Sequence, residues 1–229
     1  MRTAAALIIG NELLSGKIAD ANLVVLARAL RSLGIQLRRV VMILDEIDVI
    51  ASEVTALSAA HDVVFTSGGV GPTHDDLTIE GVARAFGAPV VTSPDLDRML
   101  RQHYGDRATE GHMLMARIPE GARLIASPKV PWPTVVMRNV WLLPGVPEIF
   151  QHKIPLIRAE LAGDAPFVSM AVLTNLDEGH IKALLDRVVA EHQDVDIGSY
   201  PKWSDDEYKT KLTFDGLRED KVRAARDAF

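Results

Sequence analysis

The sequence predicts an α/β protein in which a mostly parallel sheet is covered by helices on both faces and is followed by a small α+β subdomain. Three observations support this prediction. Short apolar runs alternate with segments of helical periodicity over most of the chain. These apolar runs are followed by glycine-containing or acidic loops. A stretch with linker composition, Gly163-Asp164-Ala165-Pro166, precedes a second series of elements. We therefore expect two domains, residues 1–165 and 166–229.

The N-terminal part supplies three pairs of a strand and a helix. The predicted strands are 5–9, 36–44 and 62–65, and the predicted helices are 23–33, 47–57 and 79–86. Gly34 and Gly87 follow the first and third helices, as glycines commonly do at helix ends. Thr78 is predicted to cap the third helix. Because parallel strands need crossover connections, this alternation indicates a largely parallel sheet.

The remaining elements follow from local signals. Ser93 before Pro94 predicts a helix that starts there and runs toward Tyr104, because proline is favoured at the first helical position. A single strand is predicted over 135–143, and a helix over 148–161 in which Pro155 should cause a break or a kink. The subdomain is predicted to contain strands at 168–173, 195–198 and 209–214 and helices at 178–190 and from Arg218 onward.

Composition excludes several classes of function. The net charge is −6 and no basic stripe is present, which argues against nucleic-acid binding. The chain has no cysteine, so disulfides, thiolate metal sites and cysteine nucleophiles are excluded. No apolar run approaches the ~20 residues that span a bilayer, and the apolar start is too short for a signal peptide. A cytoplasmic protein without membrane contact is therefore expected.

The most informative stretch runs from Thr66 to Thr78 and reads TSGGVGPTHDDLT. Its three glycines allow the backbone to approach a ligand closely, and the start of the next helix directs free N–H groups toward the same loop. Asp75 and Asp76 place two carboxylates beside this anion site, which is chemically reasonable if a divalent cation lies between them. The alternative interpretation is a glycine turn whose aspartates are surface residues or local caps.

Four loops are predicted at the carboxyl ends of strands, where open parallel sheets bind ligands. They are 10–16, 45–46, 68–78 and 144–148. Each loop alone is compatible with ordinary turn chemistry, but together they are expected to line one crevice. The predicted ligand-binding residues are Gly10, Glu12, Ser67, Gly68, Gly69, Gly71, Thr73, Thr78, Gly145 and Pro147.

These motifs resemble the molybdenum-cofactor-biosynthesis domain shared by MogA and MoaB proteins, by the N-terminal domain of competence/damage-inducible protein A (CinA) and by the molybdopterin-binding-like domain of FAD synthases. The string GGVGPTHDDLT is most similar to the last two branches. The resemblance extends over most of the chain through GNELLSG at 10–16, Asn22, LPGVP at 143–147 and GSYP at 198–201. It implies a Rossmann-like three-layer fold.

The resemblance also suggests roles for particular residues. Asp45 and Asp76 fall where MogA-like proteins have functionally important aspartates, and 68–71 fall on their phosphate- and pterin-binding loop. The sequence departs from the pattern in two places. Val70 replaces a threonine common in the MogA and MoaB branch, which weakens a molybdopterin assignment, and residues 126–133 lack the Gly-rich turn usual in CinA proteins. No stretch of the 229 residues resembles the amidase domain of CinA or the adenylyltransferase domain of FAD synthases, so those activities are not expected of them.

The resemblance thus implies metal-dependent hydrolysis of a nucleotide pyrophosphate such as ADP-ribose or FAD. Asp45 and Asp76 would be catalytic, and together with Asp75 they would bind Mg²⁺, Mn²⁺ or Co²⁺ and orient the attacking water. Two alternatives remain open: molybdopterin binding, with or without adenylylation, and a non-catalytic ligand-binding or oligomerisation module. The expected partners are a small-molecule nucleotide or pterin and further copies of the chain in a homo-oligomer, a dimer or trimer.

Other candidate sites are weaker. The seven histidines show neither an H-x-x-x-H nor an H-E-x-x-H spacing, so a histidine zinc site is not expected. Ser67 lacks the G-x-S-x-G surroundings of a hydrolase nucleophile. Trp132 and Trp203 have the right chemistry to stack on an adenine or pterin ring, and packing beneath a loop explains them equally well.

Overall fold

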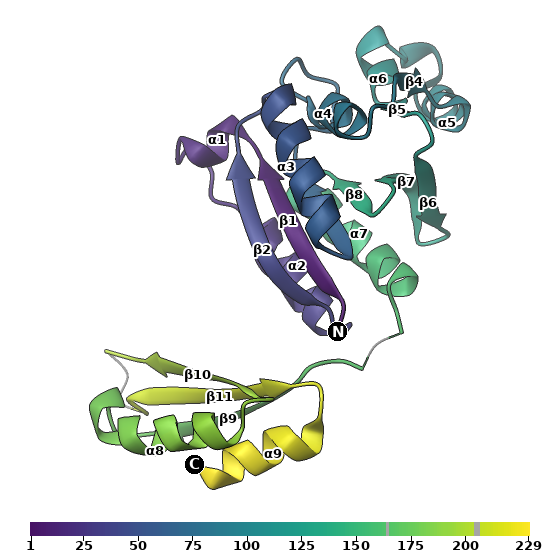
Figure 1. Cartoon of the computed structure of the whole chain (residues 1–229). Coiled ribbons are helices and arrows are strands. Elements are labelled where there is room, and N and C mark those ends of the chain that lie inside the picture. Colours follow the sequence, from purple (N-terminus) through teal and green to yellow (C-terminus); the bar gives the residue numbers. More distant parts are fainter. Residues whose placement is uncertain (164, 204–206) are drawn as a thin grey trace. The chain divides into compact units, whose positions relative to one another are not determined.

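The computed structural model describes residues 1–163, 165–203 and 207–229. The chain divides into two compact units, Met1–Gly163 and Asp164–Phe229, each with its own hydrophobic core (Figure 1). Asp164 of the predicted linker lies outside the described residues. No helix among the described residues combines the length and the apolar character needed to cross a bilayer.

The first unit is built on a six-stranded sheet with the strand order β2-β1-β3-β8-β7-β6. Strands β2, β1, β3 and β8 run parallel, while β7 and β6 add two antiparallel strands at one edge. The six strands are β1 (Thr3–Ile9), β2 (Gln36–Ile43), β3 (Val63–Ser67), β6 (Arg123–Ser127), β7 (Val130–Met137) and β8 (Val140–Leu143). The predicted mostly parallel sheet is confirmed.

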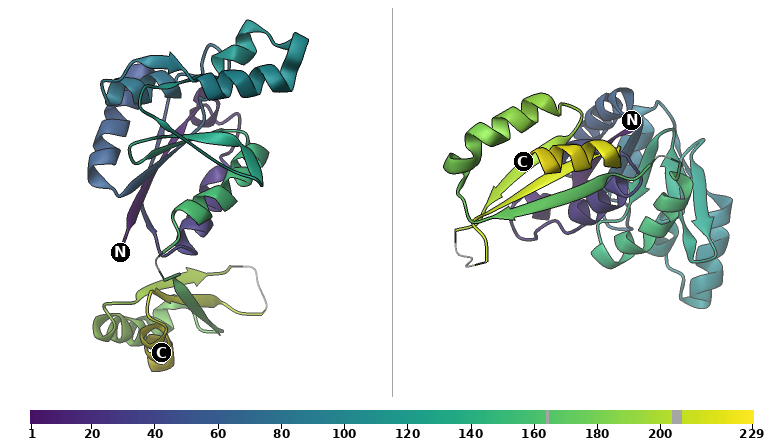
Figure 2. Two further views of the ribbon diagram at one scale, coloured as in Figure 1. Left: turned by 90° about the vertical axis from the view of Figure 1, so that its right-hand side faces the viewer. Right: turned by 90° about the horizontal axis from the view of Figure 1, so that it is seen from below.

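Helices cover both faces of this sheet (Figures 1 and 2). One face carries α2 and α7, and the other carries α3 and α4. These helices are α2 (Asn22–Arg31), α3 (Ile47–Ala60), α4 (Thr78–Ala85) and α7 (Pro147–Glu160). A short helix, α1 (Asn11–Leu14), follows β1. Three layers result, and the carboxyl ends of the four parallel strands share one edge of the sheet.

Strand β1 explains why both faces must be covered. Its side chains alternate between the two cores: Ala4, Ala6 and Ile8 pack on the α2 and α7 side, and Ala5, Leu7 and Ile9 pack on the α3 and α4 side. All six of these side chains are almost completely buried. A strand that is apolar at every position is typical of a central strand in a parallel sheet with helices on both faces.

A small lobe lies between β3 and β6 in the chain. It contains a two-stranded antiparallel sheet and two helices around a cluster of Leu96, Leu100, Ala116 and Ile118. Its elements are β4 (Val90–Thr92), α5 (Pro94–Tyr104), a 3₁₀ turn (Gly105–Arg107), α6 (Glu110–Leu114) and β5 (Arg117–Pro119). Helix α5 starts as predicted, with Pro94 in its first turn and the Ser93 hydroxyl accepting from the Leu96 N–H.

The single strand predicted over 135–143 is wrong, because the segment folds back on itself as the β7–β8 hairpin. The two-residue turn is Arg138-Asn139, and Arg138 adopts a φ of 53°. The Asn139 side chain fastens the turn by donating to the backbone oxygens of Ser58 and His61. The polar pair between two apolar runs was the available sequence signal for this turn.

Proline does not break the last helix of the first unit. Helix α7 is continuous from Pro147 to Glu160 with Pro155 inside it. Ile154, Leu156 and Ile157 around the proline are buried in the core, and this packing holds the helix together despite the lost backbone hydrogen bond.

The second unit is a small α+β fold with an antiparallel sheet in the order β10-β11-β9. Helices α8 and α9 bury Ile181, Val188 and Val222 against Leu212 and Phe214 of the sheet. Its elements are β9 (Val168–Thr174), α8 (Glu178–Glu191), β10 (Asp196–Pro201), β11 (Thr210–Gly216) and α9 (Glu219–Ala228). Their types and order match the sequence-based expectation.

Candidate functional site

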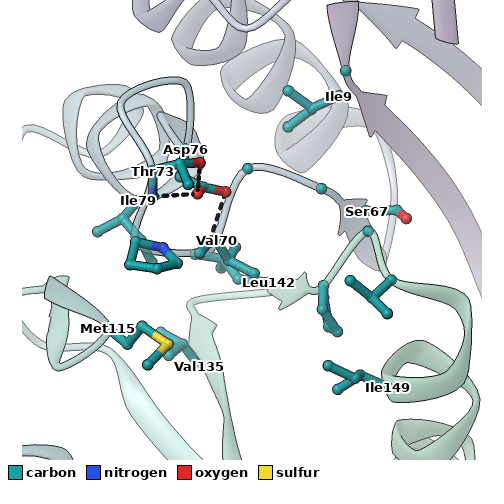
Figure 3. A pocket seen from close by; sticks show the side chains of 18 of the residues that line it. Ile9, Ser67, Val70, Thr73, Asp76, Ile79, Met115, Val135, Leu142 and Ile149 are labelled. Atoms are coloured by element: carbon teal, nitrogen blue, oxygen red, sulfur yellow. Dashed lines mark hydrogen bonds between the residues drawn. The ribbon is translucent and has the colours of Figure 1, made fainter. Parts of the chain in front are cut away.

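A pocket of about 1160 Å³ in the first unit gathers the four predicted strand-end loops (Figure 3). All but one of the predicted site residues line it. They are Gly10, Glu12, Asp45, Ser67, Gly68, Gly69, Gly71, Thr73, Asp75, Asp76, Gly145 and Pro147. The exception is Thr78, which lies beneath the glycine loop with a completely buried side chain.

The glycine loop requires glycine at two successive positions. Gly68 has a φ of 108° and Gly69 a φ of 66°, in the region that side chains with a Cβ rarely adopt. A Cβ on Gly68 would lie 2.2 Å from the backbone oxygen of Ile9. A Cβ on Gly69 would lie 2.4 Å from the hydroxyl oxygen of Thr78. At Gly68 and Gly69 the backbone is therefore packed tightly from below and has no side chain to shield it from a ligand.

Only part of the predicted anion cradle is available. The Gly68 N–H donates to the Leu143 oxygen (3.1 Å), and the Gly71 N–H donates to the Asp76 carboxylate (2.7 Å). Within the described part of the chain, the N–H groups of Gly69 and Val70 have no protein acceptor. These two neighbouring donors are the ones that residues 68–71 can offer to an anion.

The prediction that Thr78 caps α4 is wrong. The helix begins at Thr78, and Leu77 occupies the cap position without a side-chain hydrogen bond. The Thr78 hydroxyl donates instead to the Gly68 oxygen (2.8 Å), and its N–H donates to the Gly69 oxygen (2.9 Å). Thr78 thus ties the glycine loop to the start of α4.

Asp76 organises its own loop. Its carboxylate accepts from the N–H of Gly71 and from the N–H of Thr73, both at 2.7 Å (Figure 3). The Thr73 hydroxyl lies 2.5 Å from the Asp76 carboxylate and 2.6 Å from that of Asp75. The side chain of Asp76 is therefore already engaged in holding the turn that follows the free donors of Gly69 and Val70.

Asp45 is the centre of an acidic cluster. Its carboxylate accepts from the Asn11 N–H at 2.8 Å, which favours the ionised form. Burial outweighs this contact, and together with the negative charges of Glu12, Asp75 and Asp76 it raises the pKa of Asp45. The pKa of Asp75 is lowered, first of all by the Thr73 hydroxyl. The carboxylates from three strand-end loops are thus close enough to repel one another.

The donor set suits a cation only if a ligand completes it. Within the described residues, no group of three or more acidic, histidine or cysteine side chains is close enough to hold a metal by itself. Mg²⁺ in phosphate-binding sites usually takes one or two protein carboxylates and fills its remaining positions with phosphate oxygens and water. The mutual repulsion around Asp45 fits a cation that is bound together with an anionic ligand.

The opposite side of the pocket is apolar. It is formed by residues of α5, the α6 region, β7 and α7, which are Met99, Tyr104, Met115, Trp132, Val135 and Ile149. In Figure 3, Met115 and Val135 lie together, away from Asp76. Of these residues only Trp132 was predicted from the sequence.

Lys153 of α7 also lines the pocket and was likewise missed. The signal for it was its position in the helix, one turn from both Phe150 and Ile157, where an apolar residue is expected. Only 3% of Lys153 is exposed, and burial lowers the pKa of its ammonium group to about 8.

Two buried contacts hold the strand-end loops against each other. The Asn22 amide donates to the Ser67 hydroxyl (3.0 Å) and to the Gly145 oxygen (2.8 Å). Gly145 approaches the glycine loop so closely that a Cβ on it would lie 3.2 Å from the Gly68 Cα. The loop after β3 and the loop after β8 therefore form one packed unit.

This fold and site define an α/β domain with a pocket at the carboxyl ends of parallel strands, where open parallel sheets bind their ligands. Residues 5–160 match the family described as probable molybdopterin binding domain, and residues 166–229 match the FAD synthase middle domain. The chain belongs to the family of probable molybdopterin binding domains. The resemblance found in the sequence is confirmed.

Individual proteins support the same conclusion. The chain is 34% identical over 255 residues to a probable FAD synthase of Caenorhabditis briggsae. The aligned region covers 100% of this chain and 49% of that protein. It is 32% identical over 221 residues to a protein of Archaeoglobus fulgidus, and this aligned region covers 96% of this chain and 93% of that protein. The chain thus spans about half the length of the nematode relative.

Among solved structures, the CinA protein of unknown function from Thermoplasma acidophilum matches with a TM-score of 0.64 and 30% identity. The match covers 70% of this chain and 98% of that structure. This coverage is what a shared first unit would give.

Proposed function

We propose that the first unit binds the pyrophosphate group of a nucleotide, of the ADP-ribose or FAD type, and hydrolyses it with the help of a divalent cation. The observation that carries the proposal is that two free backbone donors and an acidic cluster line the same pocket. Phosphate binding alone would not call for carboxylates, and a metal site alone would not call for the glycine loop. The names of the FAD synthase relatives support a nucleotide as the ligand.

The glycine loop binds the pyrophosphate. The N–H groups of Gly69 and Val70 donate to its oxygens, and the lack of a side chain at Gly69 lets the phosphate reach them. Asp76 keeps this loop in shape by holding the N–H groups of Gly71 and Thr73. Its catalytic contribution in this proposal is to position the donors.

The acidic cluster activates water. A divalent cation (Mg²⁺, Mn²⁺ or Co²⁺) held by Asp45 and Asp75 supplies positive charge that offsets the phosphate charge and acidifies nearby water. Asp45 accepts the proton as the water oxygen bonds to phosphorus. The bond between that phosphorus and the bridging oxygen breaks, and the two halves leave as phosphate monoesters: AMP together with ribose 5-phosphate from ADP-ribose, or AMP together with FMN from FAD. Glu12 adds negative charge beside Asp45 and thereby helps to attract the cation.

A second candidate is the binding of a molybdopterin-type ligand in the same pocket. It is favoured by the description of the matching family and by the apolar side of the pocket, which suits a flat ring. Both candidates use the glycine loop, so the second substrate separates them: water in hydrolysis, a pterin phosphate in adenylylation.

Chromatography of ADP-ribose and FAD incubated with the protein tests the proposal. AMP should appear with Mg²⁺, Mn²⁺ or Co²⁺ and should not appear after exhaustive chelation. If every dinucleotide stays intact while molybdopterin binds tightly, the second candidate replaces the first. Protein that binds neither ligand would favour a non-catalytic module.

A matched pair of glycine variants ties the activity to the loop. Gly69→Ala places a methyl group against Thr78 and should abolish AMP release. Gly87 has nearly the same φ, 64° against 66°, but has open space around it and lies outside the pocket. Gly87→Ala carries a similar backbone cost and should keep full activity. Equal loss in both variants would show a stability effect instead of a site effect.

A further inference from the structure

Lys153 is a buried cation that the hydrolytic proposal does not use. Its ammonium group donates to the Trp132 oxygen at 2.5 Å and to the Pro133 oxygen at 3.3 Å. Within the described residues no ion pair of Lys153 with a carboxylate is seen, and burial lowers its pKa. An ammonium group has three N–H bonds, so one donor remains after the two carbonyl oxygens are served.

The part of the pocket lined by Trp132, Met115 and Val135 is apolar. Trp132, whose backbone oxygen Lys153 contacts, packs against the Leu96 and Leu100 cluster together with Met115 and Val135. All three of these packing residues also line the pocket. Lys153 thus shares a pocket with an aromatic ring, a methionine and a branched aliphatic side chain, and such a lining does not resemble the polar surroundings of a second phosphate site.

The size of the pocket leaves room for such a ring. Pockets of roughly 300–1,000 Å³ hold whole drug-sized ligands, and this one reaches about 1160 Å³. A pyrophosphate held at Gly69 and Val70 fills only the end near Asp45. The remaining space is bounded by the apolar side and by Lys153.

We propose that Lys153 is a specificity-determining residue: its remaining N–H donates to an acceptor on a planar heteroaromatic ring that rests against Trp132, Met115 and Val135. This inference depends on the proposed function, since it assumes that the pyrophosphate of the same ligand binds at the glycine loop. The acceptor is a ring nitrogen or a ring carbonyl oxygen, as in a purine or a flavin. The pocket would then read the ring at one end and the pyrophosphate at the other.

Calorimetric titration with ring-bearing and ring-free probes tests this proposal. The ring-bearing probes are methylene-bridged analogues of ADP-ribose and of FAD, which cannot be hydrolysed, and the ring-free probe is methylenediphosphonate, all with Mg²⁺. Lys153→Met keeps the length of the stem and removes the donor. It should weaken binding of a ring-bearing probe by about 10- to 100-fold, as for loss of a charge-assisted hydrogen bond, and leave methylenediphosphonate unchanged.

The control is Lys129→Met, which removes an exposed lysine that does not line the pocket. It should bind every probe as the wild type does. Equal affinities of Lys153→Met and wild type for the ring-bearing probes would overturn the inference while the proposed function stands. Failure of the wild type to bind any of the probes would overturn the proposed function itself.

A measurement on the wild type covers the case in which Lys153→Met does not fold. With ¹⁵N-labelled lysine side chains, the Lys153 signal is recognised by its titration midpoint near pH 8, well below that of an ordinary lysine. A ring-bearing probe should shift this signal, and methylenediphosphonate should not. A signal that neither ring-bearing probe moves would show that Lys153 only braces the Trp132 and Pro133 carbonyls.

Discussion

Asp76 illustrates how one carboxylate can serve a site through the backbone. Its carboxylate accepts hydrogen bonds from two N–H groups and a hydroxyl of its own loop. These hydrogen bonds fix the turn beside the free donors of Gly69 and Val70. This local role does not depend on a cation. It implies that the loop keeps its shape before any ligand binds, which spares the ordering cost at the moment of binding.

Asp76→Asn should therefore impair the site without unfolding the protein. The amide nitrogen of asparagine faces a backbone N–H where the carboxylate accepted a hydrogen bond, so one of the contacts to Gly71 and Thr73 is lost. We expect activity to fall roughly 100-fold or more and the Tm to change by only a few degrees. Asp95→Asn, on an exposed face of α5, is the control. Unchanged activity in Asp76→Asn would remove Asp76 from the site.

Asp45→Asn should stabilise the ligand-free protein. The folded-state pKa of Asp45 is raised, so its ionised form costs stability at every pH above that value. Asparagine removes the charge and keeps an oxygen for the Asn11 N–H. The gain should be below about 1 kcal/mol, or roughly 1–3 °C in Tm, because the site is partly solvated.

Two measurements check this interpretation of Asp45. The difference in Tm should shrink as the pH is lowered toward about 4, where the aspartic acid becomes neutral as well. Added Mg²⁺ with methylenediphosphonate should stabilise the wild type more than the variant. A variant that is less stable at pH 7 would contradict mutual repulsion within the cluster.

Residue-level chemistry was predictable where it was local. Glycines in short loops indicate positive φ values, and aspartates in such loops indicate carboxylate sites. Gly68, Gly69 and Asp45, which were predicted in this way, all line the pocket. The direction of a side chain is a tertiary property. The sequence therefore did not show that Thr78 points down to Gly68 or that Lys153 points into the pocket.

At the scale of elements, the β7–β8 hairpin and helix α7 carry residues of the apolar side of the pocket. The hairpin carries Trp132 and Val135, and α7 carries Lys153 and starts at Pro147 beside the glycine loop. One helix therefore spans from the phosphate end of the pocket to its apolar end. Predicting 135–143 as one strand hid this arrangement, because a single strand cannot return its residues to the same edge.

The buried lysine should leave a pH signature on the stability of this element. The folded-state pKa of Lys153 is about 8, against about 10.4 in an unfolded chain. Between these values the unfolded state binds more protons, so this lysine makes the unfolding free energy rise with pH. From pH 7 to pH 10 the wild type should gain about 2 kcal/mol relative to Lys153→Met.

Denaturant titration of both proteins at several pH values measures this difference. Other titrating groups affect wild type and variant alike and cancel in the comparison. Lys129→Met again provides the reference, because its lysine is exposed. Parallel curves for wild type and Lys153→Met would show that Lys153 is not held in an apolar environment.

At the scale of the whole molecule, the two units differ in what they contain. The pocket and its acidic cluster lie entirely within Met1–Gly163, and the second unit has a separate core of residues from α8, α9 and its own sheet. The order of strands and helices was largely predictable in both units, since it rests on the periodicity of apolar residues. The two antiparallel edge strands of the large sheet were not, because the turn at Arg138-Asn139 and the turn after Ser127 were not recognised in the sequence.

A fragment of residues 1–163 should fold and still bind methylenediphosphonate with Mg²⁺. All residues proposed to hold the pyrophosphate are present in it, and no core residue of the first unit is removed. Circular dichroism of the fragment tests whether it folds, and calorimetric titration tests whether it binds. A folded fragment that binds nothing would show that residues of the second unit complete the site.

The contact between Gly68 and Gly145 also constrains how this pocket can evolve. A Cβ at position 145 would press on the Gly68 backbone, and a Cβ at position 68 would strike the Ile9 oxygen. The two positions are far apart in sequence and belong to different loops, yet a change at one alters what the other can tolerate. Their substitutions should be epistatic. New ligand specificities in this fold should therefore arise more readily at Trp132, Val135 and Lys153 than at Gly68 and Gly145. A substitution at either glycine would need a compensating change at the other.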